Sequence, residues 1–406
     1  MKKGQMTALS LFSGAGGMDV GLEAAGFRII GAVEKDVVAR KSLLLNRPGA
    51  NLLGKRGDVI EVAASLTPED LGLNRGDLAL ICGGPPCQPF SAAAQWAASG
   101  RKGMRDPRAK TVDATIELID KFLPRAVLME NVLGFVQGQH SALDYLKQAM
   151  LKISQSNAVT YSVNWRLLNA ADFGVPQNRR RVIIVILRDD VTFDWPEPTH
   201  GDRPITAFEA LSDVTPKEVP IAAGKWASLL PSIPEGKNYL WLTSRGEGPE
   251  IFGYRTRYWN FLLKLARDLP SWTLSASPGP STGPFHWENR PLAVEEQLRL
   301  QTLPKDWKLE GDYRAATRQI GNATPSLLAE HLGRQLLHAL SLPGRQGQLE
   351  LSVSRDSAVT HRPLPVAPVA EVYLPLVGPK SAHAGEGKGP GARMLSTNDE
   401  EWAVSA

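Results

Sequence analysis

One of the chain's two cysteines, Cys87, lies in the segment GGPPCQPFS at residues 83–91, directly after the apolar run at residues 78–81. The run predicts a buried strand, and the glycines and prolines predict a rigid turn at its end. Proline fixes φ and removes a backbone donor, whereas glycine lets a ligand approach the main chain closely. A buried structural cysteine is the alternative, but it needs no such scaffold. The pattern therefore favours a nucleophilic thiol at the mouth of a cleft.

An acid and a pair of arginines stand beside apolar runs further along the chain. Glu130 ends one run, and Arg179 and Arg181 precede the run at residues 182–187. Because the carboxyl ends of parallel strands meet at one edge of a sheet, we expect Cys87 and Glu130 to project into the same cleft. The arginines are interpreted as lining that cleft, where their charge would favour a thiolate, rather than as a solvated basic turn.

A glycine-rich loop, FSGAGG at residues 12–17, closes the first apolar run and opens an amphipathic stretch. Such a loop brings a helix N-terminus close to a ligand. Glu34 ends the second run, where a carboxylate can accept hydrogen bonds from two ribose hydroxyls, and Asp58 is placed on a third strand, facing an adenine amino group. Together they predict an adenosine-bearing ligand. A nicotinamide cofactor and S-adenosyl-L-methionine both fit, and the scaffold around Cys87 favours the second.

The elements that must position these residues alternate regularly along the chain. Short apolar runs alternate with amphipathic stretches, which predicts an α/β fold with a doubly wound, mostly parallel sheet covered on both faces. Strands are expected at residues 8–12, 29–33, 78–82, 126–129, 165–168 and 182–187, and helices near residues 17–25, 37–45, 111–122 and 143–153.

Composition narrows the class of protein. Two cysteines in 406 residues cannot make a disulfide framework, which points to a reducing cytoplasm. The sequence carries no cluster of metal ligands, no apolar core of a signal peptide, and no run near the roughly 20 residues that span a bilayer. The formal charge of +4 permits an anionic partner without requiring one.

The rhythm also suggests domain boundaries. We expect a catalytic and cofactor-binding domain at residues 1–194. A second, smaller domain is expected at residues 195–287, which lose the rhythm and hold six of the ten tryptophans. Residues 288–342 become helical again and should return to the catalytic domain. Residues 343–406 are rich in Pro, Gly, Ala and Ser, which is typical of a disordered tail.

Taken in order, these motifs resemble those of the DNA (cytosine-5)-methyltransferase family over roughly residues 7–340, which implies a class I, Rossmann-like methyltransferase fold. In two places the chain departs from the family: Ser10 stands where an acid is usual, and Ala293 where threonine is common. The matching blocks are FSGAGG at 12–17, GPPCQ at 84–88, ENV at 130–132, QxRxR at 177–181, RxL at 290–292, Glu296, RLQ at 299–301 and GNA at 321–323.

The resemblance implies methyl transfer from S-adenosyl-L-methionine to C5 of a flipped-out cytosine in a specific duplex DNA sequence, with S-adenosyl-L-homocysteine as the second product. Cys87 would attack C6, and Glu130, kept protonated by burial, would serve cytosine N3. Arg181 would hold the base carbonyl and Arg179 would orient Glu130. The expected cofactor-binding residues are Phe12, Ser13, Gly14, Gly16, Gly17, Glu34, Asp58, Pro85 and Asn322.

Duplex DNA is the expected partner, because a stacked cytosine must leave the helix before its C6 can be attacked. The basic segment 101–110 is interpreted as a lid that grips phosphates, with a solvated loop as the alternative. In the second domain, the segment FGYRTRYW at 252–259 offers arginines that can read guanine edges, although its aromatic side chains can equally form a small core. The expected DNA-contacting residues are Gln88, Ser91, Arg101, Arg105, Arg255 and Arg257.

Different functions remain open at this point. A transfer-RNA cytosine methyltransferase would share the same centre, although the sizeable second domain favours duplex DNA. A dehydrogenase with an incidental cysteine and a non-catalytic DNA-binding module also remain, and the intact set of Cys87, Glu130, Arg179 and Arg181 argues against the module. We expect a monomer in the cytoplasm. Whether a cognate restriction endonuclease acts on the same site, and which sequence is methylated, cannot be read from these residues.

Overall fold

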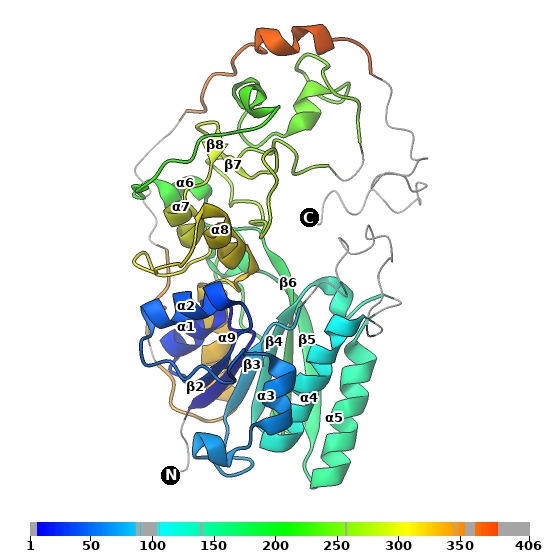
Figure 1. The fold of residues 1–406 in the computed structure, drawn as a ribbon, viewed down its shortest axis with the longest axis vertical. Helices are drawn as coiled ribbons and strands as arrows, with labels where there is room; N and C mark the ends of the chain where they lie inside the picture. The colour runs from blue at the N-terminus through cyan, green and yellow to red at the C-terminus, as the bar shows by residue number, and fades with distance from the viewer. Residues whose placement is uncertain are drawn as a thin grey trace. The chain divides into compact units, whose positions relative to one another are not determined.

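The computed structural model describes residues 6–86, 90, 104, 106–138, 141–255, 258–345, 347–353 and 362–380. The chain divides into two compact units (Figure 1). The first unit comprises Met1–Val175, Arg179–Pro204 and Gln301–Val353, and the second comprises Pro176–Asn178, Ile205–Leu300 and Ser354–Ala406. None of the described helices is long and apolar enough to cross a membrane.

The first unit is built on a six-stranded sheet with the order β2-β1-β3-β4-β6-β5. Every neighbouring pair from β2 to β4 is parallel, and β6 runs antiparallel to both β4 and β5. The predicted α/β fold with a mostly parallel sheet is confirmed. The strands are β1 (Thr7–Leu11), β2 (Arg28–Val33), β3 (Leu80–Gly83), β4 (Ala126–Asn131), β5 (Tyr161–Asn169) and β6 (Arg180–Arg188).

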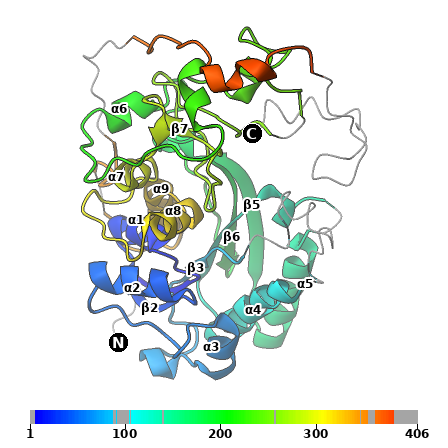
Figure 2. The ribbon, with the colours of Figure 1, turned by 45° about the horizontal axis from the view of Figure 1, so that its top comes forward.

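Helices cover both faces of this sheet (Figure 2). On one face α1 (Gly17–Ala25) and α9 (Ser326–Ala339) pack on alternate strand residues such as Leu128, and on the other face α3, α4 and α5 pack on their neighbours such as Val127. This alternation explains why the strands are apolar throughout, since both faces are buried. The remaining helices of the unit are α2 (Val37–Asn46), α3 (Val59–Ser65), α4 (Lys110–Phe122), α5 (Leu143–Asn157) and α8 (Tyr313–Asn322).

One predicted strand is absent among the residues that surround Asp58. Instead of ending a third strand, Asp58 caps the N-terminus of α3, where its side chain accepts a hydrogen bond from Ile60 N at 3.0 Å. Gly54 and Gly57 have φ values of 69° and 62°, so the chain turns twice just before this point. Before these turns the chain makes one isolated parallel bridge, between Leu52 and Ala32 of β2, and an aspartate after the turns is a favourable cap.

The described residues of the second unit contain little regular structure. It holds the helices α6 (Ala207–Leu211) and α7 (Val294–Leu300) and the two-stranded sheet of β7 (Phe285–His286) and β8 (Arg290–Pro291). Its core is built from the buried side chains of Leu229, Leu230, Ile233, Tyr239, Leu242, Ile251, Leu262, Phe285 and Tyr373. Short 3-10 helices occur in the two units at Glu69–Leu71, Pro107–Ala109, Leu133–Phe135, Ala170–Phe173, Ala227–Ser232, Tyr239–Leu242 and Glu371–Leu376.

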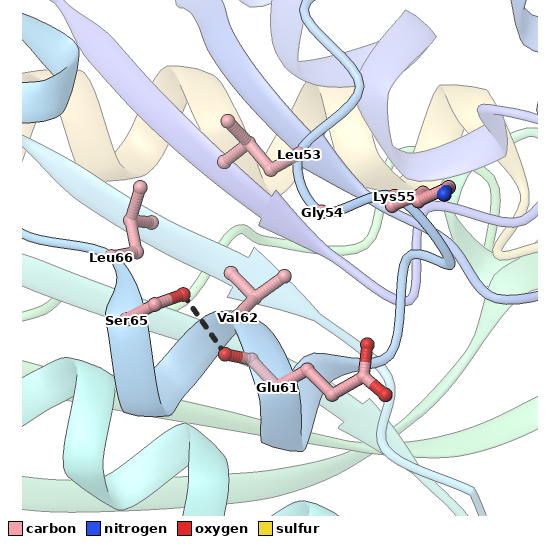
Figure 3. Close-up of a pocket in the computed structure, with 7 residues that line it drawn as sticks. All are labelled: Leu53, Gly54, Lys55, Glu61, Val62, Ser65 and Leu66. Atoms are coloured by element: carbon pink, nitrogen blue, oxygen red, sulfur yellow. Dashed lines mark hydrogen bonds between the residues drawn. The ribbon is translucent and has the colours of Figure 1, made fainter.

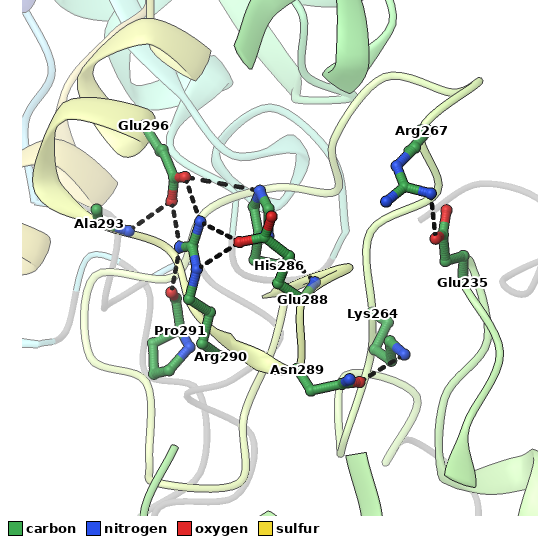
Figure 4. A network of polar contacts seen from close by, with 10 residues as sticks. All are labelled: Glu235, Lys264, Arg267, His286, Glu288, Asn289, Arg290, Pro291, Ala293 and Glu296. Carbon is green, nitrogen blue, oxygen red and sulfur yellow. Dashed lines mark hydrogen bonds and ion pairs between the residues drawn. The ribbon is translucent and has the colours of Figure 1, made fainter. Parts of the chain in front are cut away.

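A polar network ties β7 and β8 to α7 within the second unit (Figure 4). Arg290 binds Glu296 through two hydrogen bonds of 2.9 and 2.8 Å, and Glu296 also accepts one from Ala293 N at 2.7 Å. Glu296 is only 3% exposed, so its charge requires these partners. The Arg290 and Glu296 blocks of the sequence therefore have a structural role in this unit.

The boundaries of the second unit differ from the predicted ones. Its central stretch runs from Ile205 to Leu300 rather than over residues 195–287, and residues 362–380, whose composition predicts a disordered tail, pack on it. Tyr373 from this stretch is 5% exposed, because its ring joins the unit's apolar core. The proline-rich composition predicts disorder and gives no sign that Tyr373 is buried.

Candidate active site

The glycine loop lies between β1 and α1, at the point where the strand order of the sheet changes direction. Leu11 at the end of β1 is in register with Gly83 at the end of β3, so the loops that follow the two strands begin side by side. In α/β sheets, ligands bind outside the carboxyl ends of the strands at such a switch point. The loop and the segment that leads to Cys87 therefore share the ligand-binding edge.

Backbone conformation explains why this loop is rich in glycine. Gly16 has φ 90°, and a Cβ there would approach Leu43 and Arg47 to 3.0 Å. At Gly17 a Cβ would lie 2.5 Å from the carbonyl oxygen of Thr324. Around Gly14, in contrast, a Cβ would meet only the Phe12 carbonyl oxygen, at 4.0 Å. The loop is thus tightly packed on its inner side and open at Gly14.

Glu34 follows β2 and lies at the same carboxyl edge of the sheet as the glycine loop. Its carboxylate accepts hydrogen bonds from Gly14 N at 2.7 Å and from Asp36 N at 2.6 Å, and burial raises its pKa. A Cβ at Gly57 would come within 1.8 Å of the Glu34 carbonyl oxygen, so the segment carrying Asp58 lies against Glu34. A hydrogen bond of 2.7 Å from Lys35 lowers the pKa of Asp58. The structure thus places the segment that carries Asp58 against the backbone of Glu34.

These residues fit an adenosine-bearing cofactor. A carboxylate has about four lone-pair sites, so Glu34 can accept a hydrogen bond from a ribose hydroxyl in addition to those from its backbone donors. The space at Gly14 lets a ligand approach the main chain. The residues predicted to bind it, from Phe12 to Gly17, all lie in this one loop.

The segment that leads to Cys87 is held against the end of β4. Gly84 passes so close to Glu130 that a Cβ there would lie 3.1 Å from its carbonyl oxygen and 3.3 Å from its Oε2. Asn131 Nδ2 donates a hydrogen bond to the Pro85 carbonyl oxygen at 3.0 Å. β3 and β4 are parallel neighbours, as the predicted meeting of Cys87 and Glu130 requires. Cys87 itself lies outside the described residues.

Arg181 contacts Glu130. Its Nε lies 2.8 Å from Glu130 Oε1, and the two side chains are only 18% and 12% exposed. The pairing of β4 with β6 explains the contact, because Glu130 lies opposite Ile183 and Arg181 is two residues away from Ile183 on the same face of β6. The resemblance assigns the orientation of Glu130 to Arg179, whereas in the structure Arg181 contacts it.

Arg179 lies deeper and joins a different part of the site. It is 2% exposed, and its Nη2 donates a hydrogen bond to the Gly321 carbonyl oxygen at 3.1 Å. The next residue, Asn322, is exposed at the end of α8, and Thr324 follows with its carbonyl against Gly17. Arg179 and the glycine loop therefore flank Asn322, which the family resemblance, and not the local sequence, assigned to the cofactor pocket.

Two residues beside the glycine loop were not predicted. Asp19 is 1% exposed and accepts a hydrogen bond of 2.5 Å from Ser10, and burial raises its pKa to about 6. Trp307 donates from Nε1 to the Ala15 carbonyl oxygen at 3.0 Å. The sequence carries one signal for Asp19: Ser10 stands where the family usually has an acid.

The other predicted residues fall outside this group. Cys82, the second cysteine, was not a predicted site residue; it is buried in the core, and burial raises the pKa of its thiol. Arg255 lies in the second unit with its side chain exposed. Cys87, Gln88, Ser91, Arg101, Arg105 and Arg257 lie outside the described residues.

A small cavity of about 200 Å³ lies beside α3 (Figure 3). Its lining contains none of the predicted cofactor-binding residues, so we assign it no role. The lining residues are Leu53, Gly54, Lys55, Glu61, Val62, Ser65 and Leu66.

The fold and these contacts define a Rossmann-like α/β unit with a glycine loop at the switch point of its sheet. The family model for C-5 cytosine-specific DNA methylase matches residues 6–338, and the chain belongs to that family. It is accordingly an enzyme that methylates cytosine in DNA.

Individual relatives agree with this assignment. The Type II methyltransferase M.SacI of Streptomyces achromogenes is 35% identical over 394 residues, which cover 86% of this chain and 99% of the relative. The Type II methyltransferase M.NgoMIV of Neisseria gonorrhoeae is 31% identical over 347 residues, covering 83% and 98%.

Solved structures share the fold. A candidate DNA modification methyltransferase encoded within an Escherichia coli prophage has a TM-score of 0.58 at 22% identity, covering 82% of this chain and 99% of its own. Spodoptera frugiperda DNMT2 has a TM-score of 0.56 at 17% identity, covering 82% and 99%. At this level of identity the likeness concerns the fold alone.

Proposed function

We propose that the protein transfers a methyl group from S-adenosyl-L-methionine to C5 of a flipped-out cytosine in a specific duplex DNA sequence, through a covalent bond between Cys87 and C6. The observation that carries this proposal is the packing of Gly84 and Pro85 against Glu130 and Asn131. It supports a thiol and an acid that act on one base, because Cys87 follows Pro85 by two residues.

The chemistry follows from the weak nucleophilicity of cytosine C5. The Cys87 thiolate forms a bond to C6, and the electron pair of the C5–C6 double bond becomes available at C5. Glu130 donates a hydrogen bond or proton at N3 as this electron density develops. The bound cofactor supplies an electrophilic methyl group to C5. Solvent water then takes the C5 proton, the C–H electron pair restores the C5–C6 double bond as the S–C6 bond breaks to release the thiolate, and the N3 proton returns to Glu130.

The two arginines support this step in different ways. Arg181 orients Glu130 through its Nε and, since a guanidinium has five N–H donors, can also hold the base carbonyl. Arg179 is buried against Gly321 and would fix the end of α8 beside the cofactor. Both positive charges favour the thiolate form of a nearby cysteine.

S-adenosyl-L-methionine would be held by the residues of the glycine loop, with Glu34 accepting the ribose hydroxyls. Asp58 would receive the adenine amino group, and Pro85 and Asn322 would complete the pocket. The hydrogen bond of 2.7 Å from Gly14 N to Glu34 supports this assignment, because it fixes the carboxylate beside the open part of the loop.

The second unit would read the DNA sequence, with Arg255 and Arg257 at the base edges. Gln88 and Ser91 would contact the flipped nucleotide, and the segment that carries Arg101 would close on phosphates. The names of the relatives suggest a modification enzyme of a Type II restriction–modification pair, acting in the bacterial cytoplasm as a monomer on nucleoid DNA.

Bisulfite sequencing tests the proposal. The protein is expressed in a host that lacks cytosine methylation, and genomic DNA is sequenced after conversion. We expect complete protection of one cytosine within one short sequence, and none with Cys87→Ser. Unmethylated DNA together with methylated transfer RNA would overturn the DNA assignment in favour of an RNA substrate.

The covalent step has a test of its own. A duplex that carries 5-fluorocytosine at the mapped position is incubated with the protein and S-adenosyl-L-methionine, and the product is run on a denaturing gel. Because fluorine cannot leave as a proton does, the Cys87–C6 bond should persist and peptide mapping should locate it at Cys87. Methylation without such an adduct would contradict covalent catalysis.

A further inference from the structure

Residues 362–380, which we call the C-terminal strap, lie beyond the family match at residues 6–338 and pack on the second unit. Their backbone is bound to that unit along its whole length. The contacts are Arg267 Nη1 to the Arg362 carbonyl at 2.7 Å, Ala367 N to the Pro231 carbonyl at 2.9 Å, Ser232 Oγ to the Pro368 carbonyl at 3.0 Å and Gly378 N to the Glu250 carbonyl at 3.0 Å.

Tyr373 anchors the middle of the strap. Its side chain is 5% exposed, and its hydroxyl donates a hydrogen bond to the Lys225 carbonyl oxygen at 2.6 Å. Its ring stacks on Trp226 with the ring centres 5.7 Å apart. A buried, hydrogen-bonded tyrosine of this kind is a strong attachment, because it combines a large apolar area with a satisfied polar group.

From Trp226 a series of ring contacts leads to the surface. Trp226 packs edge-on against Phe252 at 4.9 Å, and Phe252 packs against Tyr239 at 6.1 Å. Tyr239, 2% exposed, then binds the backbone of Arg255 twice: its hydroxyl donates to the carbonyl at 2.6 Å and accepts from the N–H at 3.1 Å.

The exposed side of this series carries two arginine side chains. Arg255 extends over the ring of Tyr258 at 6.0 Å, and Arg245 lies over the ring of Tyr254 at 3.4 Å. Both are exposed, so their heads are free to meet phosphates or base edges while the rings limit their rotamers. In a unit with so few helices and strands, the conformation of this segment depends on the side chains packed beneath it.

We infer that the C-terminal strap positions the DNA-reading segment around Arg255, with Tyr373 as the positioning residue that acts through Trp226, Phe252 and Tyr239. The inference rests on the proposed function, in which Arg255 contacts DNA. In this proposal the strap itself does not contact DNA. It sets the affinity for duplex DNA by fixing the backbone that presents Arg255.

The experiment compares Tyr373→Ala with Tyr373→Phe in the full chain. Phenylalanine keeps the ring on Trp226, whereas alanine removes it. With duplex DNA that carries the mapped site, we expect Tyr373→Ala to raise KM for DNA by about tenfold while kcat at saturating DNA stays near that of the unchanged protein. Tyr373→Phe should stay within about twofold of the unchanged protein in both constants.

A pair of truncations separates the strap from the residues that follow it. A chain that ends at Val353 lacks the strap, and a chain that ends at Lys380 keeps it. We expect the first to raise KM for DNA at least as much as Tyr373→Ala does, and the second to behave as the full chain. The affinity for S-adenosyl-L-methionine, whose proposed site lies in the first unit, should be the same in all of them and serves as the test of folding.

The outcomes are distinguishable. If Tyr373→Ala and the chain that ends at Val353 both keep the full chain's KM for DNA, the inference is overturned while the proposed function stands. If the unchanged protein methylates no DNA, the proposed function fails first. If Tyr373→Ala does not fold, Tyr373→Leu replaces it, because leucine fills more of the space of the tyrosine ring than alanine does. We expect the same rise in KM for DNA. An unchanged KM would again overturn the inference.

Discussion

The hydroxyl of Ser10 donates a hydrogen bond of 2.5 Å to the carboxylate of Asp19, which links strand β1 to helix α1 beneath the glycine loop. The Ser10 and Ser13 hydroxyls are 2.8 Å apart, so the contact continues into the loop itself. On the other side of Asp19, Arg47 Nη1 lies 3.8 Å from Oδ2. The family usually has an acid at the position of Ser10 in the first strand. In this chain the buried acid beside that position is Asp19 of helix α1.

Asp19 should make stability depend on pH. Burial raises its pKa in the folded state to about 6 from an ordinary value of 3.8. A raised pKa means that the folded state holds the proton more tightly, so the residue's contribution is complete below about pH 4 and is lost as the pH rises through about 6. The full difference corresponds to about 3 kcal/mol in the free energy of unfolding.

Asp19→Asn isolates this effect, because asparagine still accepts the Ser10 hydrogen bond but does not titrate. We expect the free energy of unfolding of the unchanged protein, relative to that of Asp19→Asn, to fall between pH 4 and pH 7. Urea titrations at several pH values measure it. Buried histidines such as His331 titrate equally in both proteins and cancel in the difference. Parallel pH profiles for the two proteins would contradict the prediction.

Trp307 should affect cofactor binding through the loop. Its Nε1 donates to the Ala15 carbonyl oxygen at 3.0 Å, and Arg47 stacks on its ring at 5.2 Å. Trp307→Phe keeps an aromatic ring but removes the donor, which should weaken S-adenosyl-L-methionine binding by about fivefold. Calorimetric titration measures the affinity. Trp195→Phe, which alters a ring packed on Phe193 elsewhere in the unit, is the control and should bind normally.

Much of the first unit could be predicted because its signals are local. Apolar runs marked the strands, and the rule that parallel strands share an edge correctly brought the segment before Cys87 to Glu130. The strand expected at Asp58 failed because two glycine turns precede it. Asp19 was missed because its partner is nine residues away on another element, a pairing that only the packing of α1 on β1 creates.

The second unit was less predictable for a physical reason. Its residues are held by scattered tertiary contacts rather than by periodic apolar faces, so no pattern marks its limits. The strap illustrates this, since one buried ring at Tyr373 orders a stretch whose composition is typical of disorder. Likewise the Arg290–Glu296 pair, prominent in the sequence, serves internal packing.

Glu130 should be required for the chemical step and not for binding. Glu130→Gln keeps the size of the side chain and an oxygen that can accept from Arg181 Nε, but it cannot deliver a proton. We expect kcat to fall by about 10²–10⁴-fold. The affinities for duplex DNA and S-adenosyl-L-methionine should remain similar. Transfer of tritiated methyl groups measures kcat, and a loss below about tenfold would contradict a role in proton transfer.

Arg181 should act on the same step by holding Glu130 in place. Its Nε lies 2.8 Å from Glu130 Oε1 with both side chains largely buried, so the guanidinium fixes the carboxylate from one direction. Arg181→Lys keeps the charge but replaces a planar fork with a single flexible ammonium group, which cannot reproduce that orientation. We expect kcat to fall by about tenfold to a hundredfold.

Arg180→Lys is the matched control, because side chains of adjacent strand residues point to opposite faces and that of Arg180 is exposed. Similar losses in the two variants would show that general positive charge, and not the contact with Glu130, is what the reaction requires.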